Sequence, residues 1–487
     1  MGGGLMQLVA YGAQDIYLTG NPQITFFKVV YRRHTNFSME CIVQTFNGTN
    51  SIGTSGSTGT VTVSRNGDLL HKVYLRCDQD TTDGVSGDQL VSEVRLEIGG
   101  QEIDKQTREW LQVWAELTTT ESKAAGYKYL TGGFSNTLVS AGGTSQQSIM
   151  VPLQFWFCRN PGLALPLIAL QYHEVKIKCT WGTTAEVARD NGTIGTGPTV
   201  ELWADYIYLD TDERRRFAQV SHEYLIEQVQ TQPEGTAASK YKLNFNHPVK
   251  ELIWTSDAGS ITTHKAKLTL NGHDRFAEQD REYFQIRQPL DHHTAVPGYN
   301  IKETEHPQML AAPIDSGITS ENDSPESVTA VTITANGSGT GSMTYAASQT
   351  IPFKVGDIFI SSVEPASAAA TVSGGLLHQV TAVSATIVTF TPDLEAPPAS
   401  GDAMKVFIVA RAQNPTSRCS QLARDVNVYS FALKPEEHQP SGTCNFSRID
   451  TAHLQFSGSG SDVENIYAVN YNVLRIMSGM GGLAYSN

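Results

Sequence analysis

The sequence predicts an all-β chain of two related β sandwiches in tandem, with a small β insert in the second sandwich and a few short helices. Three observations predict this: the composition favours strands, the chain repeats its own patterns, and the second copy carries a surplus segment. The chain has 487 residues, too many for one ordinary hydrophobic core. Its 42 glycines and recurrent valine, threonine and serine favour strands and turns over helices.

The first repeated pattern is a strand, a turn and a helix. Residues 94–114 read VRLEIGGQEIDKQTREWLQVW, and residues 266–286 read AKLTLNGHDRFAEQDREYFQI. Both begin with alternating apolar residues, turn at Gly-Gly or Asn-Gly, and continue with helical spacing. Arg108-Glu109-Trp110 corresponds to Arg281-Glu282-Tyr283 at an offset of 173 residues.

The second repeated pattern is built around two prolines. Residues 155–177 read FWFCRNPGLALPLIALQYHEVKI, and residues 427–449 read NVYSFALKPEEHQPSGTCNFSRI. Phe157 and Pro161 align with Phe431 and Pro435 at an offset of 274. In each copy we expect a strand, a loop between the prolines, and another strand, because proline cannot donate to a β ladder. A third, weaker pair is VELWADYIYL (200–209) and VENIYAVNYNVL (463–474).

The change of offset predicts an insertion in the second copy. The difference between 173 and 274 requires about 101 extra residues between positions 283 and 429. Composition changes in the same interval, where four alternating, β-branched segments are separated by Gly, Pro and Ser turns. These segments are VTAVTITA (328–335), KVGDIFISSV (354–363), LHQVTAVSATIVTFTP (377–392) and MKVFIVAR (404–411). Each repeated copy suits a sandwich or a jelly roll.

The charge pattern argues against nucleic-acid binding. The formal net charge is −14, and no clustered Lys/Arg surface is evident. The one basic run, Arg214-Arg215-Arg216, follows Asp210, Asp212 and Glu213, so we expect it to be paired locally.

The cysteines indicate free thiols rather than a disulfide framework or a zinc site. All six are widely separated without a CxxC motif, and most lie among apolar residues, which predicts buried thiols made in a reducing compartment. The opening MGGGLMQLVAYG lacks the basic region and continuous apolar core of a signal peptide, and no apolar run is long enough to span a membrane.

Three stretches resemble one known family word for word. They are GAQDIYLTGNPQITFFKVVYRRHTNFSME (12–40), ADYIYLDTDERRRFAQVSHEYLIEQVQ (204–230) and VYSFALKPEEHQPSGTCNFSRID (428–450). They resemble the major capsid proteins of nucleocytoplasmic large double-stranded DNA viruses, particularly the phycodnavirus branch and, more distantly, the iridoviruses. The resemblance covers roughly residues 1–300 and 415–487, and does not securely cover 312–412.

The resemblance implies a tandem double jelly roll, with two eight-stranded barrels, in the capsid shell of a virion made in the host cytoplasm. It implies a homotrimer that forms a pseudo-hexagonal capsomer, because two similar barrels per chain give six per trimer. A protein with this role needs no cofactor, no catalytic site and no direct contact with nucleic acid. A stand-alone, lectin-like carbohydrate-binding β sandwich is the alternative function.

The repeats and the resemblance together divide the chain into five parts. We expect an N-terminal arm at the capsomer base (1–25), a first jelly roll (26–212), a linker with one short helix (213–222), a second jelly roll (223–311 and 413–487) and an inserted β domain on the outer surface (312–412). The arm would face minor capsid proteins and the internal membrane, and the insert is a candidate for binding host surface glycans.

Candidate site residues are few. Asp291-His292-His293 is the best metal candidate, but adjacent histidines on an extended chain point to opposite sides, so we favour a loop or interface role. Of six glycosylation sequons, Asn322 and Asn336 in the insert are the best candidates. The loop between the matched prolines is apolar in the first copy and polar in the second, so Glu436, Glu437 and His438 are predicted to contact another subunit or a minor protein.

Overall fold

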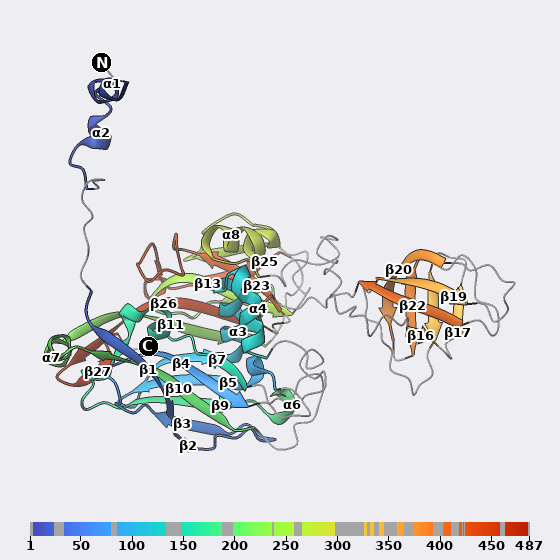
Figure 1. Ribbon diagram of the computed structural model, residues 1–487, viewed down its shortest axis with the longest axis horizontal. Coiled ribbons are helices and arrows are strands. Elements are labelled where there is room, and N and C mark those ends of the chain that lie inside the picture. Colours follow the sequence, from blue (N-terminus) through green and yellow to red (C-terminus); the bar gives the residue numbers. More distant parts are fainter. Residues whose placement is uncertain are drawn as a thin grey trace.

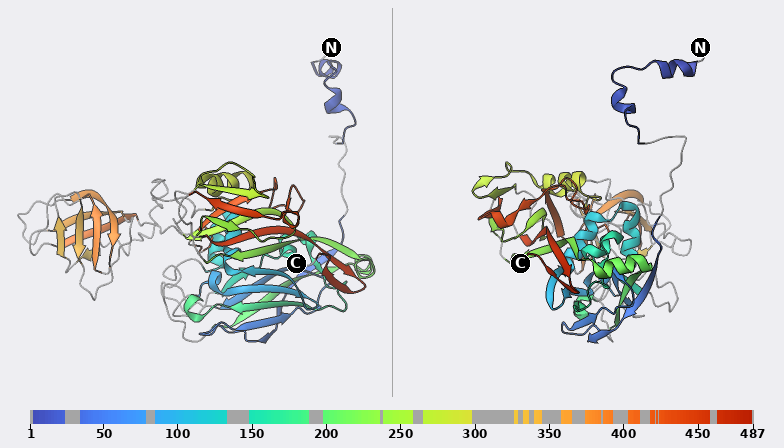
Figure 2. Two further views of the ribbon diagram at one scale, coloured as in Figure 1. Left: turned by 180° about the vertical axis from the view of Figure 1, so that it is seen from behind. Right: turned by 90° about the vertical axis from the view of Figure 1, so that its left-hand side faces the viewer.

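The computed structural model describes residues 3–23, 34–78, 85–132, 148–187, 198–235, 238–257, 265–297, 326–328, 332–335, 340–344, 358–364, 374–384, 386–392, 403–410, 418–420, 422, 424–457 and 463–485. Two β sandwiches lie against each other and form the body of the molecule (Figure 1). A separate sheet and an N-terminal arm stand apart from this body, as the left-hand view of Figure 2 also shows.

The first sandwich packs two antiparallel sheets face to face. One has the order β1-β10-β4-β7 with β8 beside β4, and its strands are β1 (Phe37–Gln44), β10 (Val200–Leu209), β4 (Leu69–Asp78), β7 (Ser148–Pro152) and β8 (Leu165–Pro166). The other has the order β2-β3-β9-β5-β6, and its strands are β2 (Phe46–Gly48), β3 (Thr58–Thr62), β9 (Val175–Trp181), β5 (Val91–Ile98) and β6 (Gln101–Thr107). Alternation sets the two faces: Val73 and Leu75 of β4 enter the core, while Tyr74 faces outward.

The second sandwich repeats this arrangement. One sheet has the order β11-β26-β13-β23, flanked by β24 and β27, and its strands are β11 (His222–Pro233), β26 (Val463–Met477), β13 (Pro248–Asp257), β23 (Arg424–Ser430), β24 (Cys444–Asn445) and β27 (Met480–Leu483). The facing sheet has the order β12-β25-β14-β15, with β12 (Lys240–Lys242), β25 (Ala452–Phe456), β14 (Ala266–Leu270) and β15 (His273–Asp274). A separate core that includes Trp254, Phe284 and Leu454 fills it.

Matching hairpin turns mark the duplication locally. Gly99 and Gly100 join β5 to β6 with φ of 59° and 86°, and Asn271 and Gly272 join β14 to β15 with φ of 48° and 80°. Two successive left-handed residues suit the right-handed twist of the strands, and glycine and asparagine adopt this conformation at least cost. The predicted turn is therefore present in both copies.

The helices lie mainly between and beside the sandwiches. They are α3 (Arg108–Thr118), α4 (Glu121–Leu130), α5 (Trp156–Arg159), α6 (Thr184–Val187), α7 (Thr211–Gln219) and α8 (Gln288–His292), which continues a π-helical turn (Tyr283–Arg287); short 3-10 turns span Gly87–Gln89, Pro161–Leu163 and Phe446–Arg448. The hydroxyl of Thr107 caps α3 by accepting a hydrogen bond from the Trp110 nitrogen at 3.3 Å. The apolar face of α3 packs on the outer face of the sheet β11-β26-β13-β23, so a helix of the first half covers the second half.

The insert forms a sheet of its own. Its strand order is β16-β22-β19-β20-β21-β18-β17, and the strands are β16 (Glu326–Val328), β17 (Thr332–Ala335), β18 (Gly341–Thr344), β19 (Ile358–Glu364), β20 (Gly374–Val383), β21 (Ile387–Thr391) and β22 (Ala403–Ala410). Phe359 and Phe390 are fully buried in it and meet edge to face at 5.3 Å between ring centroids. The four segments predicted to be strands overlap all of these except β18, whose GSMT carries too short an apolar pattern to be recognised, but they include only the last residue of β16.

Both ends of the insert attach to the end of α3. The Ala295 nitrogen, where the chain leaves, donates to the Leu117 carbonyl at 3.0 Å. Where the chain returns, the buried Glu116 carboxylate accepts hydrogen bonds from the backbone nitrogens of Cys419 at 3.0 Å and Ser420 at 2.8 Å. The last turn of a helix leaves carbonyls without helical partners. The Leu117 carbonyl is one of these, and the Glu116 carbonyl, which accepts from the Arg418 guanidinium at 2.7 Å, is another.

The N-terminal arm contains two short helices, α1 (Gly3–Val9) and α2 (Ile16–Thr19). Its apolar side chains are exposed, including Leu8, Tyr17 and Leu18. Within the described part of the chain, no helix is both long enough and apolar enough to cross a membrane.

Three local expectations were wrong. Trp156–Arg159 is a helical turn rather than the end of a strand, because Phe155, Trp156 and Phe157 are all buried together and a helical turn allows this. Asp291 and His292, expected on an extended chain, lie in the helix Gln288–His292, and only His293 is extended.

The third concerns the basic run. Arg214 pairs at 2.8 Å with Asp68, far away in the sequence, instead of with its acidic neighbours. The helix α7 does lie where the linker was expected to hold one. All six cysteines are free and four of them are buried, whereas Cys41 is exposed and Cys444 is half-buried.

Candidate functional site

A buried cluster of charges joins the two sandwiches. Arg159, at the end of α5 in the first half, pairs with Glu227 of β11 in the second. Glu227 also pairs at 2.8 Å with Lys250 of β13, whose side chain is fully buried. The Arg159 guanidinium stacks on the ring of Trp114 from α3, 4.0 Å from its centroid, and the Lys250 ammonium lies 5.4 Å from the ring of Tyr471. Each charge therefore has a partner, which a buried ionic cluster requires.

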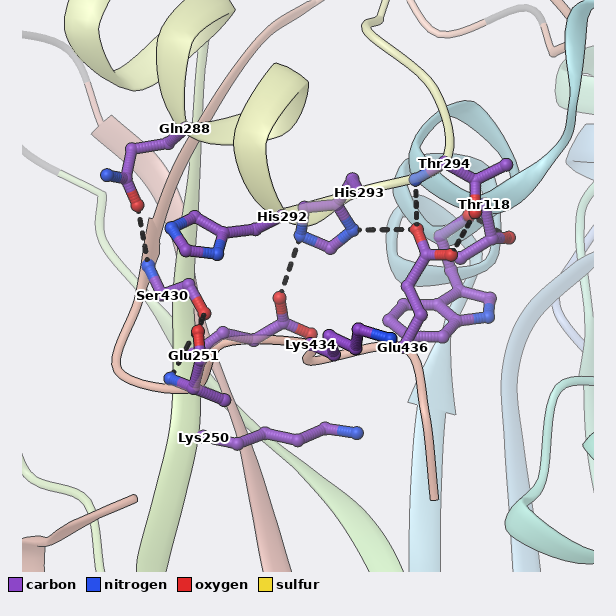
Figure 3. A network of polar contacts seen from close by, with 12 residues as sticks. Thr118, Lys250, Glu251, Gln288, His292, His293, Thr294, Ser430, Lys434 and Glu436 are labelled. Atoms are coloured by element: carbon purple, nitrogen blue, oxygen red, sulfur yellow. Dashed lines mark hydrogen bonds and ion pairs between the residues drawn. The ribbon is translucent and has the colours of Figure 1, made fainter. Parts of the chain in front are cut away.

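A histidine between two carboxylates extends this cluster (Figure 3). His293 follows α8, and its side chain is fully buried. Its Nε2 lies 2.9 Å from the Glu251 carboxylate on β13, although the two groups are not aligned as in an ideal hydrogen bond. Its Nδ1 lies 2.9 Å from the Glu436 carboxylate, which also accepts hydrogen bonds from the Thr294 nitrogen at 2.9 Å and the Thr294 hydroxyl.

The electrostatics favour a charged histidine. Burial lowers the pKa of His293, but Glu251 and Glu436 outweigh burial and raise the pKa to about 9. In the same way, burial raises the pKa of Glu436, while His293 and Thr294 overcome it and leave the pKa below its usual value. Burial lowers the pKa of Lys250, and Glu227 and Glu251 only partly offset this.

The three predicted contact residues lie beside this network but differ from one another. Glu436 is directed inward to His293 and Thr294. Glu437 is exposed and pairs with Lys434 at 2.9 Å, while His438 is half-buried. All three line a hollow of about 490 Å³ between the sandwiches, together with Arg159 and Glu227.

The ion pairs of this arrangement hold elements of the two halves together. Its ionisable groups pair with one another by charge, although the Lys250 ammonium and the Glu251 carboxylate are not aligned for hydrogen bonds. Throughout the described ranges, no group of three or more His, Cys, Asp or Glu side chains is placed to hold a metal ion. The Nδ1 of His292 instead donates a hydrogen bond to the Leu433 carbonyl oxygen, 3.1 Å away. Asn322 and Asn336 lie outside the described residues.

Sequence reasoning missed most of the cluster. Arg159, Glu227, Lys250 and Glu251 were not singled out, although PVKELIW (248–254) places two charges within an apolar strand. Such an interruption signals a buried ion pair, because an unpaired charge is seldom tolerated at a core position.

Comparison with known proteins identifies the family. The family "Major capsid protein N-terminus" matches residues 25–210, and "Large eukaryotic DNA virus major capsid protein" matches residues 213–303 and 414–482. A major capsid protein of Pyramimonas orientalis virus is 45% identical over the full length of both chains. The chain belongs to the major capsid protein family of large eukaryotic DNA viruses.

Solved structures of the same family agree with the fold. A major capsid protein of Paramecium bursaria Chlorella virus 1 is 36% identical over the full length of both chains. A chain of the quasi-atomic capsid structure of that virus superposes with a TM-score of 0.61 at 29% identity, covering 95% of this chain and all of the other.

The predicted family and the double jelly roll are confirmed by these matches. The function that follows is that of a major capsid protein in the virion shell. The relatives named above are capsid proteins, and they give no support to the lectin-like alternative.

Proposed function

We propose that this capsid protein forms a homotrimer with a pseudo-hexagonal outline, which tiles an icosahedral shell and has no enzymatic role. The observation that carries the proposal is the repeated strand order of the two sandwiches, β1-β10-β4-β7 and β11-β26-β13-β23. Three chains with two similar units each give six units around one axis, and six-fold outlines pack a surface without gaps. A closed ring of three needs only one kind of contact between chains.

The arm and the insert suit opposite roles in this proposal. The exposed apolar side chains of the arm, such as Leu8 and Leu18, fit a minor capsid protein or the internal membrane beneath the capsomer. The insert sheet, which has its own core, fits the outer surface, where its Asn322 and Asn336 sequons and any affinity for host glycans would matter. We keep the predicted division into 1–25, 26–212, 213–222, 223–311 with 413–487, and 312–412.

The loop at Glu436–His438 is proposed as a contact with another protein. Glu436 is engaged internally, so the groups offered to a neighbour are Glu437, which is exposed beside Lys434, and the half-buried His438, both of which line the 490 Å³ hollow.

Light scattering on the purified chain tests the proposal. We expect a stable particle with three times the 53.0 kDa mass of the chain. A monodisperse monomer over the micromolar range would contradict the trimer, whereas a trimer that also hydrolysed or modified a substrate would contradict only the absence of enzymatic activity.

A further inference from the structure

The two sandwiches differ in what covers one face. In the second half, the outer face of the sheet β11-β26-β13-β23 is buried beneath α3. Trp110 of α3 lies 5.2 Å from Tyr467 of β26 between ring centroids, and Leu117 at the end of α3 is fully buried in the same cluster. The equivalent face in the first half carries Met39 and Val43 of β1, which are 49% and 48% exposed.

The equivalence of the two faces follows from strand register. The ten-residue strands β4 and β13 correspond to each other. Cys77 of β4 pairs with Val200, the first residue of β10, and Ser256 of β13 pairs with Val463, the first residue of β26. Further along, Trp203 pairs with Tyr74 in the first half, and Tyr467 pairs with Ile253 in the second. Trp203 therefore has the place of Tyr467.

The same register extends to the edge strands. Val43 of β1 lies opposite Trp203, and Thr231 of β11 lies opposite Tyr467. Met39 lies four residues before Val43 in β1, and Glu227 lies four residues before Thr231 in β11. Met39 therefore occupies the place of Glu227, the residue that pairs with Arg159 across the seam between the two halves.

The covering elements also have counterparts in the second half. Tyr283 matches Trp110, so Leu290 of α8 matches Leu117 of α3. Leu117 is fully buried, but Leu290 is 66% exposed. Phe431 matches Phe157, so Leu433 has the place of Arg159, and it is 73% exposed.

One chain thus carries both surfaces of a contact that it does not make within itself. We call Met39, Val43, Tyr74 and Trp203 the open sheet face, and we call Leu290 and Leu433 the covering face. The hydrogen bond from His292 to the Leu433 carbonyl joins the two segments of the covering face. The open sheet face belongs to the first sandwich and α8 to the second, and they lie apart in Figures 1 and 2. Within one chain Leu290 and Leu433 stay exposed, as do Met39 and Val43.

We infer that the covering face of one copy packs on the open sheet face of the next copy, as α3 and α5 pack on the second sandwich within the chain. Three such head-to-tail contacts close a ring of six alternating units. The seam within a chain uses the ion pair Arg159–Glu227, and the seam between copies uses the apolar pair Leu433–Met39 in its place. The inference rests on the proposed trimer and names the surfaces that form it.

A charge exchange tests the pairing. Met39→Glu and Leu433→Arg each place a lone charge in the contact, and we expect each to raise the concentration at which the trimer dissociates by roughly 100-fold. The double variant recreates the ion pair of the internal seam, so we expect its dissociation to return to within about tenfold of the unmodified chain, because a buried pair and an apolar pair of similar size are close in free energy. Ile387→Glu is the matched control, since Ile387 is a strand residue of the insert with 41% exposure.

Light scattering across a dilution series gives the readout, and circular dichroism checks that every variant is folded. Cys41, between Met39 and Val43 on β1, supplies a second measurement: a maleimide should react with it at least tenfold more slowly in the trimer than in the folded Met39→Glu monomer. Trimers unaffected by either single change, or a double variant no better than the singles, would overturn the inference. An unmodified chain that is monomeric would overturn the proposed trimer instead.

Discussion

At the end of α3, the Glu116 carboxylate accepts four hydrogen bonds from residues 418–420, which follow the insert. It is buried, and it replaces the water that the backbone nitrogens of Cys419 and Ser420 would otherwise bind. A single side chain thus fixes where the chain re-enters the second sandwich.

Removing this acceptor should be costly. We expect Glu116→Ala to lower the free energy of unfolding by about 3 kcal/mol, because buried backbone nitrogens lose a charged acceptor. Glu121→Gln is the control: Glu121 contacts Arg418 at 3.6 Å but is 85% exposed, so its loss should cost less than about 0.5 kcal/mol. Urea unfolding measures the free energy of unfolding of the two variants. Equal values for both would show that Glu116 is not needed at this junction.

His293 gives the fold a dependence on pH. Its pKa is about 9 in the folded chain against 6.5 as a free side chain, so its contribution is complete below pH 6.5 and is lost as pH rises through 9. The groups facing it are Glu251 on β13 and Glu436 on the loop. We expect His293→Gln to cost about 3 kcal/mol at pH 6 and little at pH 10. Urea unfolding at both pH values measures the difference, and a cost that is the same at both would show that His293 is not charged in the fold.

Single residues were the least predictable level of the structure. The sequence places Asp291-His292-His293 together, but not the carboxylates of Glu251 and Glu436 that give His293 its role. These partners are brought together by tertiary contacts between segments more than 40 residues apart, which no local pattern records. Glu436 was singled out as a contact residue from its polarity, and the fold directs its carboxylate inward.

Among the elements, α3 has the broadest role. It belongs to the first half of the chain, covers a sheet of the second half, and holds both ends of the insert. The repeat REW…REY predicted a helix at this point in each copy, and helical segments are present in both. The repeat could not reveal that Leu117 at the end of one copy is buried against a sheet of its own chain while Leu290 at the end of the other is 66% exposed.

Deleting the insert tests its independence. Residues 315–410 contain its seven strands, while the attachments at Ala295 and at Cys419–Ser420 lie outside this range. Replacing the range with a short linker should therefore leave trimer formation intact, since closing a loop of different length costs little. Sedimentation of the deletion variant measures this. Aggregates or monomers would show that the insert contributes to the contact between copies.

For the whole molecule, duplication is the feature that sequence analysis captured best. Paired offsets of 173 and 274 predicted two related halves and a surplus of about 101 residues in the second. The two sandwiches and the separate seven-stranded sheet have this organisation. Strand alternation and turn residues are local properties, so they survive in the sequence, whereas the packing of one half on the other depends on pairs such as Arg159–Glu227.

Class averages of the purified particle in negative stain, viewed down its symmetry axis, test the central claim most directly. The account predicts a three-fold particle with six similar lobes in a closed ring and one additional projection from every second lobe. Single two-lobed particles, or two-fold dimers in which the same face of each copy meets itself, would contradict it.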